Sequence, residues 1–427
     1  MQSHRMILSR ASRPSTVPAR ALAVAATAML AACGGGGGGD DAPSTPAAVQ
    51  TRLCPASLDY TTTFTGGTGS GELVKVQIDT TKKTWQVTFL DSSVPRQTGT
   101  VQPTRSDPTN GQNVMRGTLK AETGLPTEKL NQCAFELTGA SLDPNRPAKL
   151  FVGEGVMGGT IPGARIQFNG VLGAGAVPDT TFPYFQFIGF AQTETDLSKI
   201  TGQYNGTGFH EVPSKQFKTV AQDYRMALAA DGSFTVCDNA TNTCERKGNN
   251  FVPQANGALL STNYKAESQP PTLGSTLGKA YLIVGKLRGQ LVPIMIRVGY
   301  ANDSLANGPL GADDEIGIGM MAPAMTITQG TVNGEYVGVD SNFNYRVTAL
   351  VGAAATMMDP FRPSDASLAI PYQLDYSQQV PGVVRTSRRD APAGSAPTGK
   401  LMFTGGVFGF LEQRDSGPYF TVGAFVQ

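Results

Sequence analysis

The sequence has 427 residues, with 34 lysines and arginines against 33 aspartates and glutamates, giving a formal net charge of +1. Nucleic-acid binding by electrostatic attraction requires a basic excess, so this balance excludes it. The chain holds 51 glycines and 28 prolines, and only 16 % of its residues are charged. This composition favours many short strands joined by turns over a helical bundle, and it gives no biochemical activity.

The N-terminus has the pattern of a secretory signal peptide. Residues 1–20 contain four arginines and no acidic residue, and residues 21–30 are apolar. Ten apolar residues are too few to span a bilayer as a helix. We therefore predict a signal peptide over residues 1–32.

The motif Leu30-Ala31-Ala32-Cys33 resembles the lipobox of Gram-negative bacterial lipoproteins. The resemblance implies cleavage after Ala32 and lipid on Cys33, with palmitate among its acyl groups. Gly34 stands where aspartate typically retains such lipoproteins at the inner membrane, so outer-membrane sorting is implied, on the periplasmic face or at the cell surface. The alternative is an ordinary signal peptide followed by a structural Cys33.

Residues 33–50 are expected to form a flexible tether. Six consecutive glycines at 34–39 are followed by a stretch rich in aspartate, alanine and proline, which cannot bury apolar surface. Removal of residues 1–32 takes away four arginines and no acid, so the net charge falls from +1 to −3. The expected contact with the membrane is therefore through the lipid.

Four cysteines follow the anchor, and an even number in an exported chain predicts two disulfides. Cys237 and Cys244 flank a turn-rich hexapeptide, which favours a local bond between them. This leaves Cys54 to pair with Cys133. A zinc site is the rival interpretation, but the cysteines contain no CxxC pair.

The body shows apolar and polar residues in alternation, which predicts antiparallel strands. Three candidate hairpins stand out, the second with an Asp-Gly turn at 231–232: residues 74–78 with 85–89, 224–228 with 234–236, and 345–349 with a return after Gly352. We therefore predict an all-β, antiparallel protein.

Internal similarity divides this body into three related β units at 51–194, 195–325 and 326–427. The repeated segments are two openings (202–206, 334–338), three lysine-led strands (149–153, 279–285, 400–405) and two closing strands (183–192, 418–427). Each unit is large enough for a small barrel or sandwich, and a propeller-like single body is the alternative. The Gly-x-Tyr-x-Gly openings loosely resemble the Gly-x-Trp opening of lipocalins, with Tyr204 or Tyr336 in place of tryptophan.

Residues typical of catalytic sites are scarce. His210 is the only histidine after the signal peptide, no Gly-x-Ser-x-Gly motif is present, and we interpret His210 as a surface or turn residue. Asp313, Asp314 and Glu315, together with Asp303, are weak candidates for binding a hard cation, with a solvated loop as the default. We expect neither a catalytic residue set nor a cofactor.

The hypothesis that these features favour is a non-enzymatic outer-membrane lipoprotein. Its β scaffold is expected to bind an envelope protein or a small ligand, or to help maintain the envelope. A carboxylate-dependent hydrolase acting on envelope glycans and a lipocalin-like carrier of an apolar ligand are the alternatives. As a whole, the chain resembles uncharacterised proteobacterial lipoproteins with a glycine-rich tether and a β-rich body.

Overall fold

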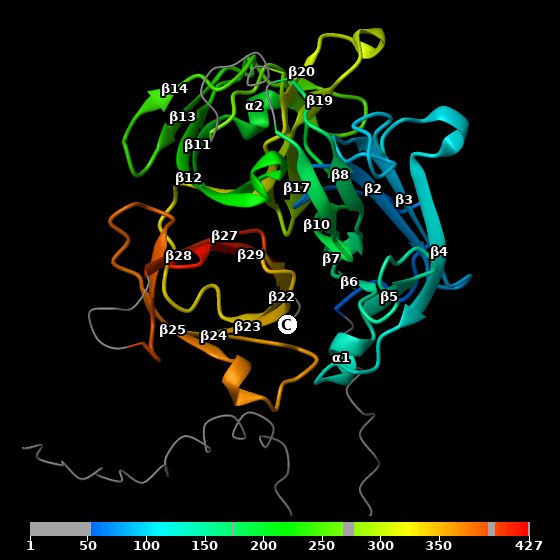
Figure 1. Ribbon diagram of the computed structural model, residues 1–427. Helices are drawn as coiled ribbons and strands as arrows, with labels where there is room; N and C mark the ends of the chain where they lie inside the picture. Colours follow the sequence, from blue (N-terminus) through cyan, green and yellow to red (C-terminus); the bar gives the residue numbers. More distant parts are fainter. Residues whose placement is uncertain (1–52, 173–174, 268–276, 392–397, 426–427) are drawn as a thin grey trace, which may run out of the picture. The chain divides into compact units, whose positions relative to one another are not determined.

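The computed structural model describes residues 53–172, 175–267, 277–391 and 398–425. The described chain is almost entirely antiparallel β-sheet, arranged as two closed eight-stranded barrels and one open sheet between them in sequence (Figure 1). The all-β, antiparallel prediction is confirmed. The sheets are barrels and a curled sheet, and not the blades of a propeller-like body.

The first barrel is an up-and-down meander with one excursion. Its last strand, β10, pairs with its first, β1, and so closes the sheet. A separate hairpin of β8 (Arg165–Phe168) and β9 (Val177–Thr181) lies between β7 and β10 in the chain. The barrel strands are β1 (Phe64–Thr68), β2 (Leu73–Asp79), β3 (Thr84–Asp91), β4 (Val114–Ala121), β5 (Ala134–Thr138), β6 (Ala148–Val152), β7 (Val156–Pro162) and β10 (Tyr184–Phe190).

The last barrel is a meander without interruption, in which β29 pairs with β22. Its interior is filled by buried aromatic side chains, among them Tyr372, Phe408 and Phe410. The strands are β22 (Gly334–Asp340), β23 (Tyr345–Val351), β24 (Ala354–Met358), β25 (Ile370–Asp375), β26 (Val384–Arg388), β27 (Thr398–Thr404), β28 (Val407–Arg414) and β29 (Gly417–Phe425).

The middle sheet has nine strands and two edges, β14 and β15, and we call it the half-barrel. Its last strand, β21, pairs with its first, β11, as in the two barrels. A short pair, β19 (Tyr300–Asn302) and β20 (Gly311–Asp313), precedes β21. The strands are β11 (Gly202–Val212), β12 (Lys218–Leu228), β13 (Phe234–Asp238), β14 (Cys244–Glu245), β15 (Val252–Pro253), β16 (Leu259–Ser261), β17 (Lys279–Leu287), β18 (Gln290–Val298) and β21 (Ile316–Pro323).

Equivalent positions in the three sheets carry the repeated sequence segments. The lysine-led segments form β6, β17 and β27, which are each the third strand from the end of their sheet. The opening tyrosines also repeat one contact. The hydroxyl of Tyr204 donates to the Ile200 carbonyl, and that of Tyr336 donates to the Val332 carbonyl, four residues earlier in both cases.

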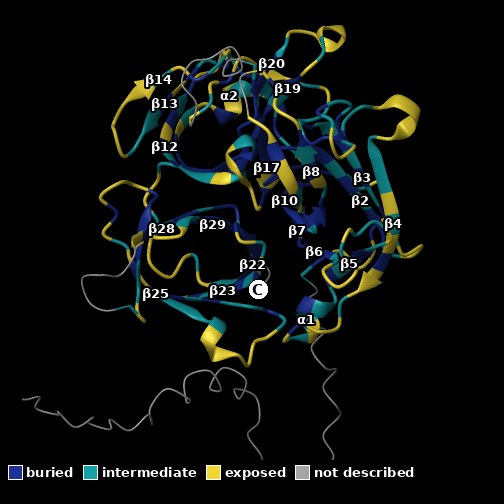
Figure 2. Cartoon of the chain, viewed as in Figure 1, coloured by how far each residue is buried: buried dark blue, intermediate teal, exposed yellow. Residues whose placement is uncertain are grey.

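One apolar cluster joins the outer faces of all three sheets. It contains Phe190 from the first barrel, Phe209 from the half-barrel and Phe420 from the last barrel, with the rings of Phe209 and Phe420 5.8 Å apart. Ion pairs join consecutive sheets at the lysine-led strands, Lys279 to Asp91 at 2.6 Å and Lys400 to Asp223. Buried residues, dark blue in Figure 2, accordingly lie on both faces of many strands.

The three predicted hairpins are present as β2–β3, β12–β13 and β23–β24. Both disulfides form with the favoured pairing, Cys54–Cys133 and Cys237–Cys244. The second links β13 to β14 and so fixes one edge of the half-barrel.

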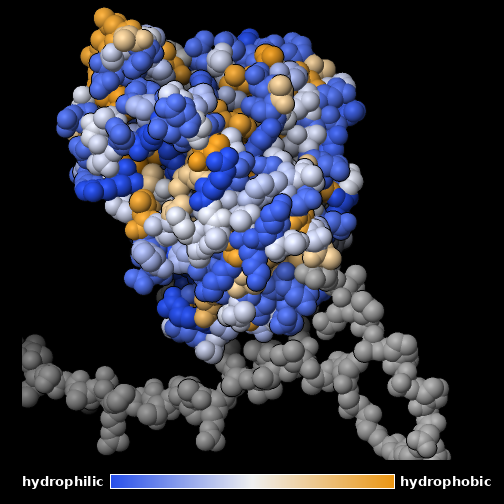
Figure 3. Space-filling view, turned by 90° about the vertical axis from the view of Figure 1, so that its right-hand side faces the viewer, coloured by the Kyte–Doolittle hydropathy of each residue, from blue (hydrophilic) through white to orange (hydrophobic). Residues whose placement is uncertain are grey.

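Helices are few and short in the described chain. The α-helices are α1 (Glu128–Asn131) and α2 (Leu197–Ile200). None of the helices in the described ranges has the length and hydropathy to cross a bilayer. The face shown in Figure 3 is largely hydrophilic, with apolar residues in small groups. Cys33, the signal peptide and the whole tether lie outside the described residues.

Candidate functional site

The interior of the half-barrel has an apolar part and a polar end. Met295 and Met321 belong to the apolar cluster that fills the interior. Successive side chains of a strand alternate between its two faces, so Arg297 on β18 shares the inward face with Met295. By the same alternation, His210 lies on the inward face of β11 with Tyr204. Polar side chains therefore gather where the apolar filling ends.

Arg297 is the central cation of this polar end. It is 1 % exposed and lies 2.5 Å from a carboxylate oxygen of Asp313. It also donates to the backbone carbonyls of Tyr264 (3.0 Å) and Glu315. Burial disfavours the guanidinium charge, but the charges of Asp313 and Glu315 outweigh burial and raise the pKa of Arg297. Arg297 is therefore a charged bridge from β18 to the loop at Tyr264 and to the segment from Asp313 to Glu315.

His210 is bound to Glu315 inside the half-barrel. Its Nδ1 lies 2.7 Å from Glu315 Oε1, and its side chain is buried. A carboxylate only accepts, so Nδ1 carries the proton of this hydrogen bond. The ring lies against Gly317 on β21, where an added Cβ would come within 2.4 Å of the ring. The prediction of a surface or turn histidine is wrong, because strand parity directs His210 inward.

The Glu315 carboxylate also accepts hydrogen bonds from the backbone that follows Tyr264. The backbone N–H of Glu267 donates to both carboxylate oxygens of Glu315, at 3.1 Å each. In the described part of the chain, no serine, threonine or cysteine side chain is hydrogen-bonded to His210. The pair of His210 and Glu315 thus has the geometry of a base and its orienting acid, without a nucleophile in contact.

The four acidic candidates for a cation site do not converge. Asp313 and Glu315 face Arg297 and His210, whereas Asp314 points the other way and accepts from the Ser214 N–H at 2.6 Å. Asp303 is exposed in the loop after β19. Over the described ranges, no group of three or more histidine, cysteine or acidic side chains is placed to hold a metal ion. Asp313 ends β20, and Asp314 and Glu315 form the link to β21, where neighbouring side chains take different directions.

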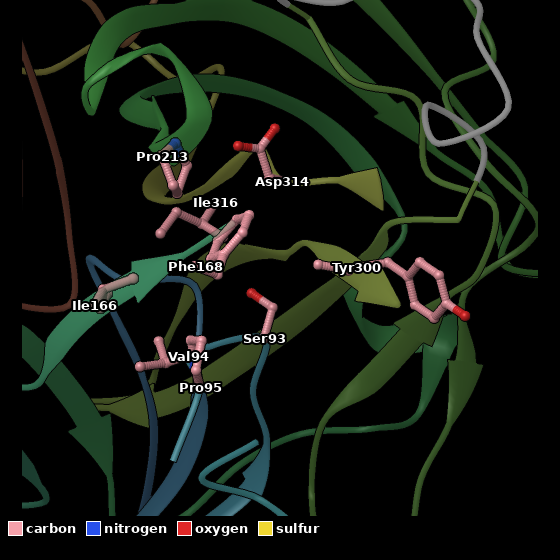
Figure 4. A pocket seen from close by; sticks show the side chains of 10 residues that line it. Ser93, Val94, Pro95, Ile166, Phe168, Pro213, Tyr300, Asp314 and Ile316 are labelled. Atoms are coloured by element: carbon pink, nitrogen blue, oxygen red, sulfur yellow. The ribbon is translucent and has the colours of Figure 1, made fainter. Parts of the chain in front are cut away.

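Asp314 lines a small pocket between the half-barrel and the loop that follows β3 (Figure 4). Phe168 and Ile316 lie at its centre, and the Tyr300 ring points away from them. The cavity volume is about 20 Å³, room for roughly one water molecule. This pocket is too small to hold a substrate.

A larger pocket lies at the polar end, beside the part of β12 that extends past its pairing with β13. Its volume is about 300 Å³, at the lower end of the range for small-molecule sites. Gln222 and Tyr224 line it, with exposed fractions of 6 % and 4 %. Among the described residues, neither the Gln222 Nε2 atom nor the Tyr224 hydroxyl has a hydrogen-bond partner. Buried polar groups nearly always have partners, so these two mark the pocket as a candidate binding site.

Charged side chains form the opposite wall of this pocket. Lys247 lies 2.8 Å from Glu267 and 2.7 Å from Glu245. Burial lowers the pKa of Lys247, but the adjacent glutamates outweigh burial and raise it, so the lysine stays charged. Burial, reinforced by the charge of Glu267, raises the pKa of Tyr224, so its hydroxyl stays protonated. We call this pocket, lined by Gln222, Tyr224, Lys247, Glu267 and their neighbours, the β12 pocket.

Glu211 makes the stability of the protein depend on pH. Burial raises its pKa to about 8, against roughly 4.3 in an unfolded chain. Between these values the folded state keeps a proton that the unfolded state has lost, so stability falls as pH rises. Relative to Glu211→Gln, we expect the wild type to lose about 2 kcal/mol between pH 5.5 and pH 7. Urea unfolding at both pH values measures this loss.

Glu335→Gln provides the control for this measurement, since Glu335 is only partly buried near the start of β22. It should keep the pH dependence of the wild type. An equal pH dependence in Glu211→Gln and the wild type would contradict the assignment of the effect to Glu211.

Sequence reasoning missed Arg297, Gln222, Tyr224 and Lys247. One signal was available for Arg297, because it is the only charged residue in the apolar strand at 290–298. A charge inside such a strand is seldom fully buried unless it has a partner. The other three lie in strands or loops of ordinary polarity, and only the curvature of the sheet brings them together.

A comparison with curated proteins finds no match. Residues 84–424 match the family described as a protein of unknown function, DUF2957. The matched region includes the half-barrel, the last barrel and most of the first barrel. Since it covers most of the chain, this protein belongs to the DUF2957 family.

Proposed function

We propose that this chain is an outer-membrane lipoprotein, anchored through lipid on Cys33, whose β body binds a small molecule. The observation that carries the binding role is the β12 pocket, where Gln222 and Tyr224 present polar atoms without partners. Membership of a family of unknown function with a barrel fold is compatible with a binding scaffold. The support for the anchor is the sequence pattern ending at Cys33.

The packing inside the last barrel favours this proposal over a carrier of apolar ligands. A lipocalin-like carrier needs an apolar cavity inside a closed barrel. The last barrel is instead filled by aromatic side chains, such as Tyr372 and Phe410 with ring centroids 5.1 Å apart. The first barrel encloses Trp85 and Phe89 in the same manner.

The anchor is tested by mass spectrometry of the protein extracted gently from its own membrane. We expect a mature N-terminus at Cys33 with acyl mass on it, and loss of both in Cys33→Ser. The Cys33→Ser protein should also be absent from the membrane fraction, because without the lipid it loses its main hydrophobic contact with the bilayer. Gly34→Ala keeps the cysteine and serves as the control, which should remain acylated.

The same native spectra test the binding role. A discrete small bound mass supports the proposal, and its loss in Gln222→Ala locates the molecule in the β12 pocket. Unmodified Cys33 in the wild type would overturn the anchor. Protein without bound mass, whatever the state of Cys33, would count against the binding role alone.

A further inference from the structure

We propose that the β12 pocket binds a neutral hydroxylated molecule of the size of a mono- or disaccharide. The inference rests on the proposed function, since it names the class of molecule that the pocket takes. It follows from the polar atoms that lack partners, the charges around them and the volume of the pocket.

The Tyr224 hydroxyl is held in a fixed position. The ring lies flat against Gly206 on β11, where an added Cβ would come within 2.3 Å of the ring atoms. Tyr224 is paired directly opposite Gly206 in the sheet, so the ring occupies the space that a side chain would take. The hydroxyl therefore cannot turn away to find another partner, and it remains available at the pocket.

Gln222 adds a second polar group on the same face of β12. It lies two residues before Tyr224 and opposite Gly208, another position without a side chain. Its Nε2 atom donates hydrogen bonds, and no residue in the described ranges accepts from it. A bound molecule must therefore offer at least one acceptor to this side of the pocket.

Acidic side chains give the pocket a negative rim. Asp223, Asp238, Glu245 and Glu267 line it together with a single lysine, Lys247. These carboxylates have partners, among them Lys400 for Asp223 and Thr241 for Asp238. Each carboxylate oxygen has further lone pairs, so a bound molecule can still donate to them.

The two walls together select the class of molecule. An anion would supply acceptors for Gln222 and Tyr224, but it would face four carboxylates. A simple ammonium ion would suit the carboxylates, but it has no acceptor for the Gln222 donor. Hydroxyl groups both donate and accept, so a sugar can satisfy both walls without a net charge. A pocket of about 300 Å³ holds a molecule of this size.

The test uses the full chain, purified in a detergent without a sugar head group. Saturation-transfer NMR and calorimetric titration are performed with glucose, galactose, N-acetylglucosamine, maltose and cellobiose at millimolar concentrations. Methylammonium, which has no hydrogen-bond acceptor, and inorganic phosphate serve as the cationic and anionic probes. We expect at least one sugar to bind and neither ion to bind.

Two variants locate the site. Gln222→Ala and Tyr224→Phe should each weaken sugar binding by about tenfold, the loss expected for one hydrogen bond between a protein and its ligand. Gln203→Ala changes an exposed glutamine on β11, and Tyr376→Phe removes another buried hydroxyl without a partner, on the last barrel. Both controls should bind sugar as the wild type does.

The outcomes separate this inference from the proposed function. Binding of methylammonium or phosphate that is weakened by Tyr224→Phe would overturn the sugar assignment and keep the small-molecule function. Sugar binding that neither variant weakens would overturn the β12 pocket as the site. Absence of binding by the whole panel would overturn the inference, and a native spectrum with bound mass would then still support the proposed function.

Discussion

Replacement of Arg297 by methionine is expected to destabilise the folded protein by about 3–5 kcal/mol, the usual cost of removing one partner of a buried ion pair. Arg297 is 1 % exposed, and both Asp313 and Glu315 are fully buried beside it. Without the guanidinium, two carboxylates remain in a low-dielectric interior with only part of their hydrogen bonds. Urea unfolding of the wild type and the variant at pH 8 measures the loss.

The destabilisation of Arg297→Met should shrink as the pH falls. Unpaired buried carboxylates take up protons more readily than paired ones, so the variant recovers part of its stability near pH 5. Arg225→Met is the matched control, because Arg225 is exposed on β12, and it should change stability by less than about 0.5 kcal/mol. Equal stability of Arg297→Met and Arg225→Met would refute the structural role of the buried network.

Removal of the Cys54–Cys133 disulfide is also expected to cause a large loss of stability. The two cysteines are 79 residues apart, so the bond closes a long loop in the unfolded chain. Loop-closure entropy predicts a loss of about 4.5 kcal/mol for the double variant Cys54→Ala/Cys133→Ala. Thermal and denaturant unfolding of the oxidised proteins measure it.

The second disulfide provides the comparison. Cys237 and Cys244 are 7 residues apart, and the same entropy argument gives about 2.5 kcal/mol for their removal. A larger loss from Cys237→Ala/Cys244→Ala than from Cys54→Ala/Cys133→Ala would show that loop length does not control stability here. The Cys237–Cys244 disulfide would then stabilise the protein mainly by holding the edge strands β13 and β14 together in the folded state.

The all-β class and the three hairpins could be predicted well because the information is local. The alternation over 73–79 and 84–91 reports one buried face, and the Asp-Gly turn at 231–232 fixes the register of β12 and β13. The spacing of Cys237 and Cys244 also indicated their pairing. Barrel closure was left open, because pairing of β1 with β10 joins residues more than a hundred positions apart.

The polar end of the half-barrel could not be predicted for the same reason. His210 lies on β11 and Arg297 on β18, while Glu315 stands directly before β21. Neither β11 nor β18 shows which way its sheet curls. The sequence placed Asp313, Asp314 and Glu315 together as candidate ligands. In the turn of the chain from β20 to β21, however, the Asp314 side chain binds the Ser214 N–H while Asp313 binds Arg297. The β12 pocket forms where β13 stops pairing with β12. The position of this end point depends on the twist of the whole sheet, and no single residue in the sequence indicates it.

The apolar cluster around Phe190, Phe209 and Phe420 has a consequence for the autonomy of the repeated units. The apolar outer face of each sheet is buried only against the other two sheets. Removal of one repeat would therefore expose apolar side chains on both remaining sheets. The repeating unit of the sequence is one sheet, whereas the unit that folds independently contains all three sheets. Heating should produce a single cooperative heat-absorption peak for the whole body, rather than successive unfolding of the two barrels and the half-barrel.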